Sequence, residues 1–188
     1  MGELIYSMSV SADGFIEGPD GDFSWTPPSE ELFRFHTDRV ARLGAHLCGR
    51  RLYETMLYWE DVDRVGALDE DERRFAAIWQ RLPKVVFSTT LDRVEGEARL
   101  ARGSVSEEVL RLKEQVNADL EVGGATLAAE CIEFDLVDEY RIFVHPVIVG
   151  GGKPFFPSLR AGLELELVET RAFDSRVVYL RYRRSRGE

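Results

Sequence analysis

Two glycines separate a strand-like segment from an alanine-rich segment in the second half of the chain. Residues 120–122 favour a strand, Gly123 and Gly124 follow, and residues 125–130 favour a helix. Because glycine has no side chain, a ligand can approach the backbone closely there. The start of the helix directs unpaired N–H groups and the positive end of the helix dipole at that ligand. This order predicts a binding site for a phosphate or pyrophosphate group, although a glycine pair also serves as a plain turn.

Three other glycine-containing segments also follow predicted strands. In open α/β sheets, ligands bind just outside the carboxyl ends of the strands. Four such loops at one edge of a sheet therefore predict a large, nucleotide-like ligand, and turns without a ligand remain the alternative. The further segments are Asp13-Gly14, Gly49-Arg50 and residues 150–152.

Alternating strand and helix patterns position these loops. Ser29 is predicted as a helix N-cap, and Ser104 with Glu107 forms a capping box. Strand–helix units followed by a run of strands are typical of α/β proteins. The sequence predicts one α/β domain, residues 1–188, with a mostly parallel central sheet, helices on both faces and C-terminal antiparallel strands. The predicted strands are residues 4–10, 45–48, 84–88, 120–122, 139–149, 163–169 and 176–182, and residues 15–21 are predicted as a loop.

The composition limits the partners of the protein. The 188 residues carry a formal net charge of −10, which repels nucleic acids and anionic membranes. Cys48 and Cys131 form no spaced motif, which favours buried thiols in a reducing compartment and predicts no metal site. No signal peptide is expected, and no apolar run approaches the ~20 residues of a membrane helix. We therefore expect a cytoplasmic protein without nucleic-acid or membrane partners.

The chain contains five motifs in a fixed order: residues 8–16, 49–54, 86–91, 122–125 and 145–152. Their order and spacing resemble the dihydrofolate reductase-like superfamily. Within it, the chain is most similar to the C-terminal reductase domain of RibD, the deaminase-reductase of riboflavin biosynthesis. The resemblance implies a three-layer dihydrofolate reductase-like fold, NADPH as the cofactor, a small-molecule substrate and a homodimer.

The resemblance also implies which residues bind the cofactor. In this family a Gly-Arg pair binds the cofactor phosphates, a hydroxyl pair meets the adenosine ribose and its 2′-phosphate, and a Gly-Gly pair lies against the pyrophosphate and nicotinamide. The family often has threonine where this chain has Leu52, which removes one hydroxyl donor. Surface solubility for the arginines and turn capping for the hydroxyls remain the alternatives. The matching residues are Gly49, Arg50 and Arg51, then Ser88 and Thr89, then Gly123, Gly124, Ala125 and Thr126.

Two carboxylates are candidates for catalytic proton transfer. The cofactor supplies the hydride, whereas the protein must position the acceptor and exclude water. Asp13 lies in a loop that the family places near the nicotinamide, and the segment from Glu31 to Phe35 resembles the carboxylate helix of folate reductases. A plain turn at Asp13 and helix-start electrostatics at Glu31 remain the alternatives. Trp25 and Phe35 are candidates to line a flat acceptor pocket, and we expect Phe35 to belong to the core.

The predicted function is that of an NADPH-dependent reductase of a small heterocyclic substrate. The resemblance implies an activity similar to 5-amino-6-(5-phosphoribosylamino)uracil reductase in riboflavin biosynthesis. An NADP(H)-binding module without catalysis remains one alternative, favoured by Leu52 and by the lack of a second phosphate site in the sequence. A dihydrofolate reductase that uses Glu31 is the other alternative. Residues 142–144 and the final strands are expected to support the homodimer.

Overall fold

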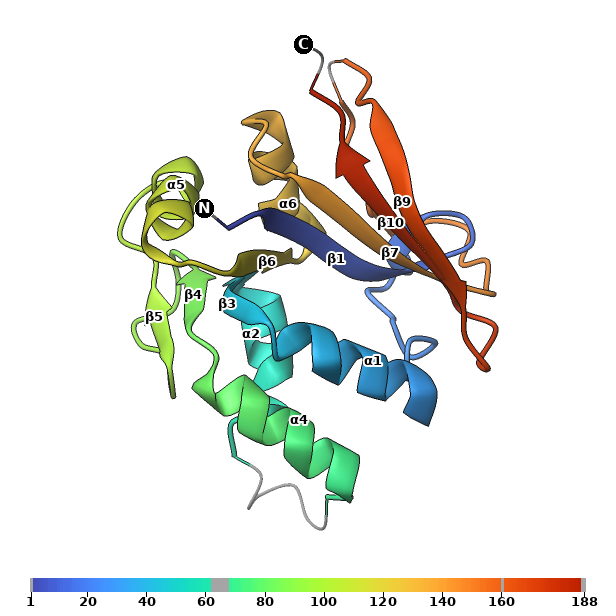
Figure 1. Cartoon of the computed structure of the whole chain (residues 1–188), viewed down its shortest axis with the longest axis horizontal. Helices are drawn as coiled ribbons and strands as arrows, with labels where there is room; N and C mark the ends of the chain where they lie inside the picture. The colour runs from blue at the N-terminus through green and yellow to red at the C-terminus, as the bar shows by residue number, and fades with distance from the viewer. Residues whose placement is uncertain (1, 62–67, 160, 187–188) are drawn as a thin grey trace.

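An eight-stranded sheet forms the centre of the molecule (Figure 1). The structure is a computed structural model that describes residues 2–61, 68–159 and 161–186. The strands of this sheet are β1 (Leu4–Ser11), β3 (Leu43–Gly49), β4 (Lys84–Phe87), β5 (Ala98–Leu100), β6 (Asp119–Gly123), β7 (Glu139–His145), β9 (Leu165–Ala172) and β10 (Val178–Arg184). They lie side by side in the order β5-β4-β3-β6-β1-β7-β10-β9.

Most neighbouring strands of the sheet run in the same direction. The pairs from β5 to β7 are parallel, whereas β10 is antiparallel to both β7 and β9. This arrangement confirms the predicted fold class. Parallel strands place their carboxyl ends at one edge, so the loops after β1, β3, β4 and β6 meet there.

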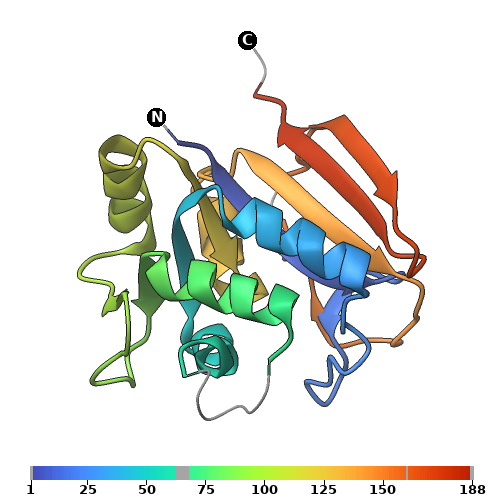
Figure 2. The ribbon, with the colours of Figure 1, turned by 60° about the horizontal axis from the view of Figure 1, so that its bottom comes forward.

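Helices cover both faces of the sheet. Tyr53 of α2 (Arg50–Met56) packs on Cys48. Leu127 of α6 (Ala125–Glu133) belongs to the same hydrophobic cluster as Leu47. Leu47 and Cys48 are successive residues of β3 and point to opposite faces of the sheet, so α2 and α6 lie on opposite sides of it. Figure 2 shows α1 and α4 beside each other over one face. The helices are α1 (Glu30–Val40), α2 (Arg50–Met56), α4 (Glu70–Arg81), α5 (Val105–Gln115) and α6 (Ala125–Glu133), followed after α2 by the 3-10 turn η1 (Leu57–Trp59).

The predicted helix starts are confirmed. The Ser29 hydroxyl accepts a hydrogen bond from the Leu32 N–H, and Ser104 and Glu107 form the expected capping box. Such caps satisfy N–H groups that the helix itself leaves unpaired. Phe35 is also confirmed as a packing residue, because its ring contacts Phe143 and further aromatic rings on the sheet. In the described part of the chain, no helix has the length and apolar composition needed to cross a membrane.

Several predicted segments differ from the structure, including the last strand, which covers Val178–Arg184 rather than 176–182, and β5, which was not predicted. The predicted strand 139–149 ends at His145, because Pro146 has no N–H to continue the ladder. Residues 15–21 were expected as a loop, but β2 (Phe15–Glu17) pairs with β8 (Lys153–Pro154) in a separate two-stranded sheet. Strand β9 covers Leu165–Ala172, whereas the predicted strand covered 163–169. The ends of β9 are set by its pairing with β10.

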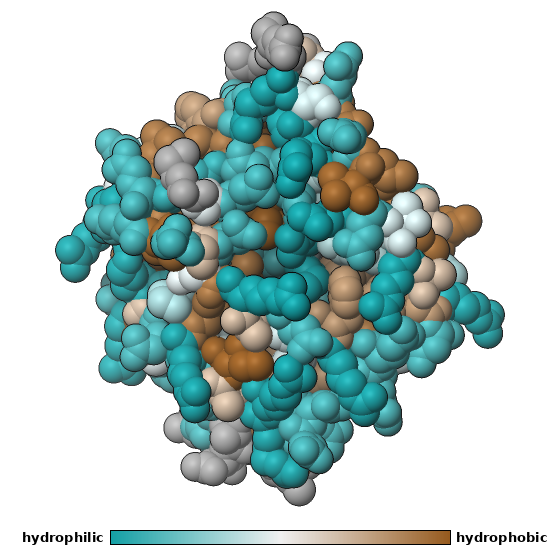
Figure 3. Space-filling view, viewed as in Figure 1, coloured by the Kyte–Doolittle hydropathy of each residue, from teal (hydrophilic) through white to brown (hydrophobic). Residues whose placement is uncertain are grey.

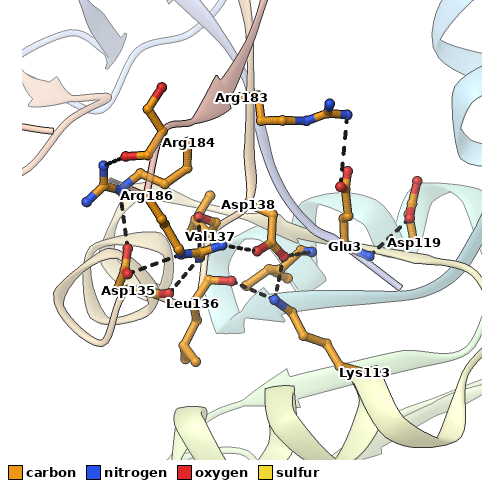
Figure 4. A network of polar contacts seen from close by, with 12 residues as sticks. Glu3, Lys113, Asp119, Asp135, Leu136, Val137, Asp138, Arg183, Arg184 and Arg186 are labelled. Atoms are coloured by element: carbon orange, nitrogen blue, oxygen red, sulfur yellow. Dashed lines mark hydrogen bonds and ion pairs between the residues drawn. The ribbon is translucent and has the colours of Figure 1, made fainter. Parts of the chain in front are cut away.

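A network of charged side chains joins elements at the amino ends of the central strands (Figure 4). The Asp138 carboxylate accepts hydrogen bonds from the Leu4 N–H at 2.8 Å, from Arg186 Nη1 at 2.8 Å and from Lys113. Arg186 also binds Asp135. This network ties α5, the start of β1 and the end of the chain together. It lies at the edge of the sheet opposite the glycine loops, so it stabilises the scaffold without occupying that edge.

Candidate active site

Glycine loops meet at the carboxyl edge of the parallel strands. A Cβ atom built on Gly14, Gly49, Gly124 or Gly150 would meet no heavy atom within 4 Å. The first three of these glycines follow β1, β3 and β6, which are neighbours in the sheet. The predicted segments therefore lie at one edge of the sheet, and each of these four glycines has open space where a side chain would stand.

The two glycines of the central pair differ in their surroundings. A Cβ atom on Gly123 would lie 2.3 Å from Leu52 Cδ2 and 3.1 Å from His46 Cε1. Gly123 therefore provides close packing of α2 on the sheet, and Leu52 fills the place where the family often carries a hydroxyl. Gly124 instead has a φ of 91°, which L-residues rarely adopt, and open space beside it.

Among the described residues, no side chain caps the start of α6. Gly124 is the N-cap of this helix and supplies no side-chain cap. Ala125 is buried and Thr126 is exposed at the surface. With no capping side chain, the first turn of α6 directs its N–H groups at the open space. This geometry suits an anionic group such as a pyrophosphate.

A cation and hydroxyl groups meet at the ends of β3 and β4. Arg50 Nη1 donates to Thr90 Oγ1 at 3.3 Å, and Ser88 Oγ lies 3.4 Å from the same oxygen. Ser88 also accepts the N–H groups of Thr90 and Leu91, so it caps the turn as well. Thr89 is exposed beside them. We call Arg50, Ser88, Thr89 and Thr90 the Arg50 cluster. Thr90 was not predicted, although its hydroxyl directly follows the predicted pair.

The side chain of Arg51 points towards β2 and away from the side chain of Arg50. Its Nη1 lies 3.5 Å from Glu17 Oε1 in β2, and its side chain is 78% exposed. The structure thus separates the two predicted arginines. Arg50 joins the hydroxyl cluster, whereas Arg51 contacts the small second sheet.

Each of the two candidate catalytic carboxylates accepts hydrogen bonds from backbone N–H groups of a distant loop. Asp13 accepts the N–H of Val149 at 3.2 Å and that of Gly150 at 2.8 Å, which ties the loop after β1 to the loop after β7. Ser11 and these amides lower the pKa of Asp13, so its carboxyl is ionised at neutral pH. Glu31 accepts the Asp174 N–H at 2.9 Å and Arg171 Nη2 at 2.6 Å, which places it at the β9–β10 turn, apart from the Arg50 cluster. Their catalytic roles stay predictions.

A second polar group lies beside the glycine loops, and sequence reasoning did not identify it. His145 Nε2 lies 3.1 Å from Ser9 Oγ, and the ring centroids of His145 and Trp25 are 5.5 Å apart. His145 belongs to a motif of the family resemblance, but nothing local in the sequence links it to Ser9. Among the described residues, no group of three or more His, Cys, Asp or Glu side chains is arranged to hold a metal ion.

The sheet order, the glycine loops and the C-terminal antiparallel strands define a dihydrofolate reductase-like α/β protein. A dihydrofolate reductase from Enterococcus faecalis, complexed with NADP(H) and RAB-propyl, superposes with a TM-score of 0.64 at 18% identity, covering 98% of both chains. A putative riboflavin biosynthesis protein from Shewanella sp. PV-4 superposes with a TM-score of 0.78 at 21% identity, covering 98% of this chain and 99% of the other.

The sequence identifies the family within this fold. The family model of the RibD C-terminal domain matches residues 3–179. The uncharacterized protein YyaP of Bacillus subtilis (strain 168) is 32% identical over 180 residues, which cover 95% of this chain and 93% of YyaP. This chain belongs to the RibD C-terminal domain family.

Proposed function

We propose that this protein is a cytoplasmic, NADPH-dependent reductase of a small heterocyclic substrate, similar to 5-amino-6-(5-phosphoribosylamino)uracil reductase. The observation that carries the proposal is the open space beside Gly49 and Gly124, which stand at the carboxyl ends of the neighbouring strands β3 and β6 where α2 and α6 begin. Membership of a reductase family and a structural likeness to an enzyme complexed with NADP(H) support it.

The proposed cofactor contacts follow from the chemistry of these groups. The N–H groups of Ala125 and Thr126 suit the pyrophosphate, and Gly124 leaves room for it to approach. The Arg50 guanidinium and the hydroxyls beside it suit the 2′-phosphate that distinguishes NADPH from NADH, because a guanidinium binds phosphate through charge-assisted hydrogen bonds. When bound, the nicotinamide supplies a hydride, and the protein holds the acceptor beside it and excludes water.

The Arg50→Gln variant tests the assignment of the 2′-phosphate. Loss of charge-assisted hydrogen bonds is expected to weaken NADPH binding about 10-fold, while NADH binding changes less than about 3-fold. Titration of the reduced coenzymes, followed by their fluorescence, measures both. Arg51→Gln should weaken NADPH binding less than Arg50→Gln, and Arg34→Gln, a substitution in an exposed ion pair with Asp71, serves as the control. Absence of NADPH binding to the unmodified protein would contradict the proposed function itself.

An NADP(H)-binding module without catalysis is the second candidate. The sequence shows no second phosphate site for a phosphoribosyl substrate, which favours binding without catalysis. Turnover separates the two functions. Oxidation of NADPH with 5-amino-6-(5-phosphoribosylamino)uracil or dihydrofolate supports the reductase, and binding without oxidation supports the module.

We also propose that the protein forms a homodimer through its C-terminal hairpin. Leu167 and Val168 of β9 and Val178 of β10 expose large apolar side chains, and Figure 3 shows hydrophobic residues at the surface over β9. Such side chains favour burial against a second copy. Sedimentation velocity at micromolar concentration should show a dimer, and Leu167→Lys should shift it to a monomer. A monomeric unmodified protein would rule this interface out.

A further inference from the structure

A row of buried charged and polar side chains crosses the face of the sheet that α1 and α4 cover (Figure 2). Lys84 of β4, His46 of β3 and Glu121 of β6 are register partners on three neighbouring strands. Each of the three is at most 8% exposed. Ionised groups are rarely buried in this way, and a buried ion pair adds little stability compared with apolar packing. The row therefore favours a role beyond stability alone.

Arg39 joins α1 to the strand that carries Gly123. Its Nη2 donates to Glu121 Oε2 at 2.6 Å and to Ser7 Oγ at 3.0 Å, so one guanidinium connects α1 to the neighbouring strands β6 and β1. The side chains of Arg39 and Glu121 are each 10% exposed, so salt and water screen this pair little. Glu121 lies two residues before Gly123 and on the same face of β6. The ion pair therefore holds β6 directly before the turn into α6.

The ring of His46 packs against Gly123. A Cβ atom on Gly123 would stand 3.1 Å from His46 Cε1, and the imidazole also meets Trp79 of α4 at a ring-centroid distance of 5.2 Å. Burial lowers the pKa of His46, so the ring is neutral at neutral pH. Its Nδ1 has no hydrogen-bond partner among the described residues, and its Nε2 lies 3.9 Å from Glu121 Oε1, beyond hydrogen-bond distance. Because an unpartnered buried nitrogen costs free energy, the ring contributes here through its packing against Gly123.

The position of Gly123 determines where α6 starts. Gly124 follows as the N-cap, and its C=O accepts the Ala128 N–H at 3.0 Å, which is the first hydrogen bond of the helix. The N–H groups of Ala125 and Thr126, proposed above to bind the pyrophosphate, lie in this first turn. A shift of β6 at Gly123 would move both donors, and a displacement of about 1 Å is enough to weaken a positioned interaction strongly.

We propose that Arg39, Glu121 and His46 are positioning residues for the proposed cofactor site. The ion pair of Arg39 and Glu121 holds the end of β6, and the ring of His46 supports Gly123, so the first turn of α6 is fixed before the cofactor binds. Each side chain acts through the backbone of the turn. The entropy of ordering this turn is then lost on folding and not on binding, which raises the affinity. The inference rests on the proposed function.

Two matched substitutions test the ion pair. Glu121→Gln removes the charge two residues before Gly123. Glu60→Gln makes the same change at a pair on β4, which β3 separates from β6. The two carboxylates are equivalent in burial and pairing, because the Glu60 side chain is 8% exposed and lies 2.8 Å from Lys84 Nζ. Both variants should lower the melting temperature by similar amounts, about 5 °C each. Only Glu121→Gln should weaken NADPH binding, by about 10-fold, whereas Glu60→Gln should change it less than about 2-fold.

Hydrogen exchange of the Ala128 amide provides a readout that needs no cofactor. Ala128 is fully buried and its N–H bonds the C=O of Gly124, so its exchange reports opening at the start of α6. Glu121→Gln should speed this exchange about 10-fold more than Glu60→Gln does. A role in global stability alone would change the exchange equally in the two variants.

His46→Ala is the second variant, and it keeps the proposal testable if Glu121→Gln does not fold. It removes the ring beside Gly123 and should weaken NADPH binding about 10-fold, while His46→Gln, whose planar amide fills part of the same space, should restore part of the affinity. Equal effects of Glu121→Gln and Glu60→Gln on affinity and exchange would overturn the proposal, as would unchanged exchange of Ala128 in both Glu121→Gln and His46→Ala. If the unmodified protein does not bind NADPH, the proposed function fails, whereas the exchange of Ala128 still decides whether these residues hold the turn.

Discussion

The Gly124→Val variant is expected to bind NADPH at least about 100-fold more weakly than the unmodified protein, a loss of about 3 kcal/mol. Its side chain would stand in the open space before the first turn of α6, where the pyrophosphate is proposed to lie. The φ of 91° at this position is also unfavourable for a β-branched residue, which adds strain of about 1–3 kcal/mol. Coenzyme fluorescence titration, well below the melting temperature of the variant, measures the loss.

The neighbouring glycine provides the comparison. Gly123→Ala places a methyl group against Leu52 and His46, which is expected to destabilise the fold by about 1 kcal/mol with a much smaller effect on NADPH affinity. Leu52→Ala should cost less stability in the Gly123→Ala background than in the unmodified protein, because there it also removes the clash. If Gly124→Val binds NADPH normally, the cofactor does not lie at the start of α6.

The Glu139→Ala variant is expected to lower the free energy of unfolding by about 3–5 kcal/mol. Glu139 is fully buried, and its carboxylate binds Arg141 Nε at 2.5 Å and Arg181 Nη2 at 2.7 Å. Its removal leaves two guanidinium groups without their shared partner between the sheet and α1. Urea denaturation followed by tryptophan fluorescence measures the change. Glu169→Gln is the matched control, because Glu169 is 44% exposed, lies 3.9 Å from Arg181, and should contribute less than about 0.5 kcal/mol.

Because Glu139 is ionised in the folded protein, we expect the free energy of unfolding to depend on pH. Burial alone would raise the pKa of Glu139, but the hydrogen bond from Arg181 and the charge of Arg141 outweigh it and lower the pKa below its ordinary value. A carboxylate with a lowered pKa in the folded state stabilises the fold above the unfolded value, near pH 4.3, and loses that contribution as the pH falls through the folded value. The stability difference between the unmodified protein and Glu139→Gln should therefore shrink from about pH 5 towards pH 3. A constant difference would contradict this origin.

The two glycines of the Gly123-Gly124 pair have different roles, one in packing and one at the proposed binding site. Gly123 and Gly124 are adjacent and chemically identical, yet one contacts Leu52 and the other faces open space. Leu52, which stands where the family often has threonine, therefore packs against the sheet and offers no hydroxyl. The hydroxyl donors nearest to Arg50 come instead from the end of β4, at Ser88 and Thr90.

The sequence by itself determined the local elements and their order. The N-cap at Ser29, the capping box at Ser104 and the turn before α6 are set by side chains within three or four residues of each other. Interactions at that spacing do not depend on the rest of the fold. The order of strands and helices then implied a parallel sheet with its loops at one edge, and the family resemblance predicted which of these loops would bind a cofactor.

Only the tertiary structure decided which side chains meet. Ser9 and His145 are 136 residues apart, and Glu31 and Arg171 are 140 residues apart. Their contacts follow from β1 lying next to β7 and from the β9–β10 turn lying against the start of α1. The direction of Arg51 likewise depends on β2, whose pairing with β8 joins segments far apart in the chain. Such contacts depend on strand order and register, and residue type and spacing along the chain do not encode them locally.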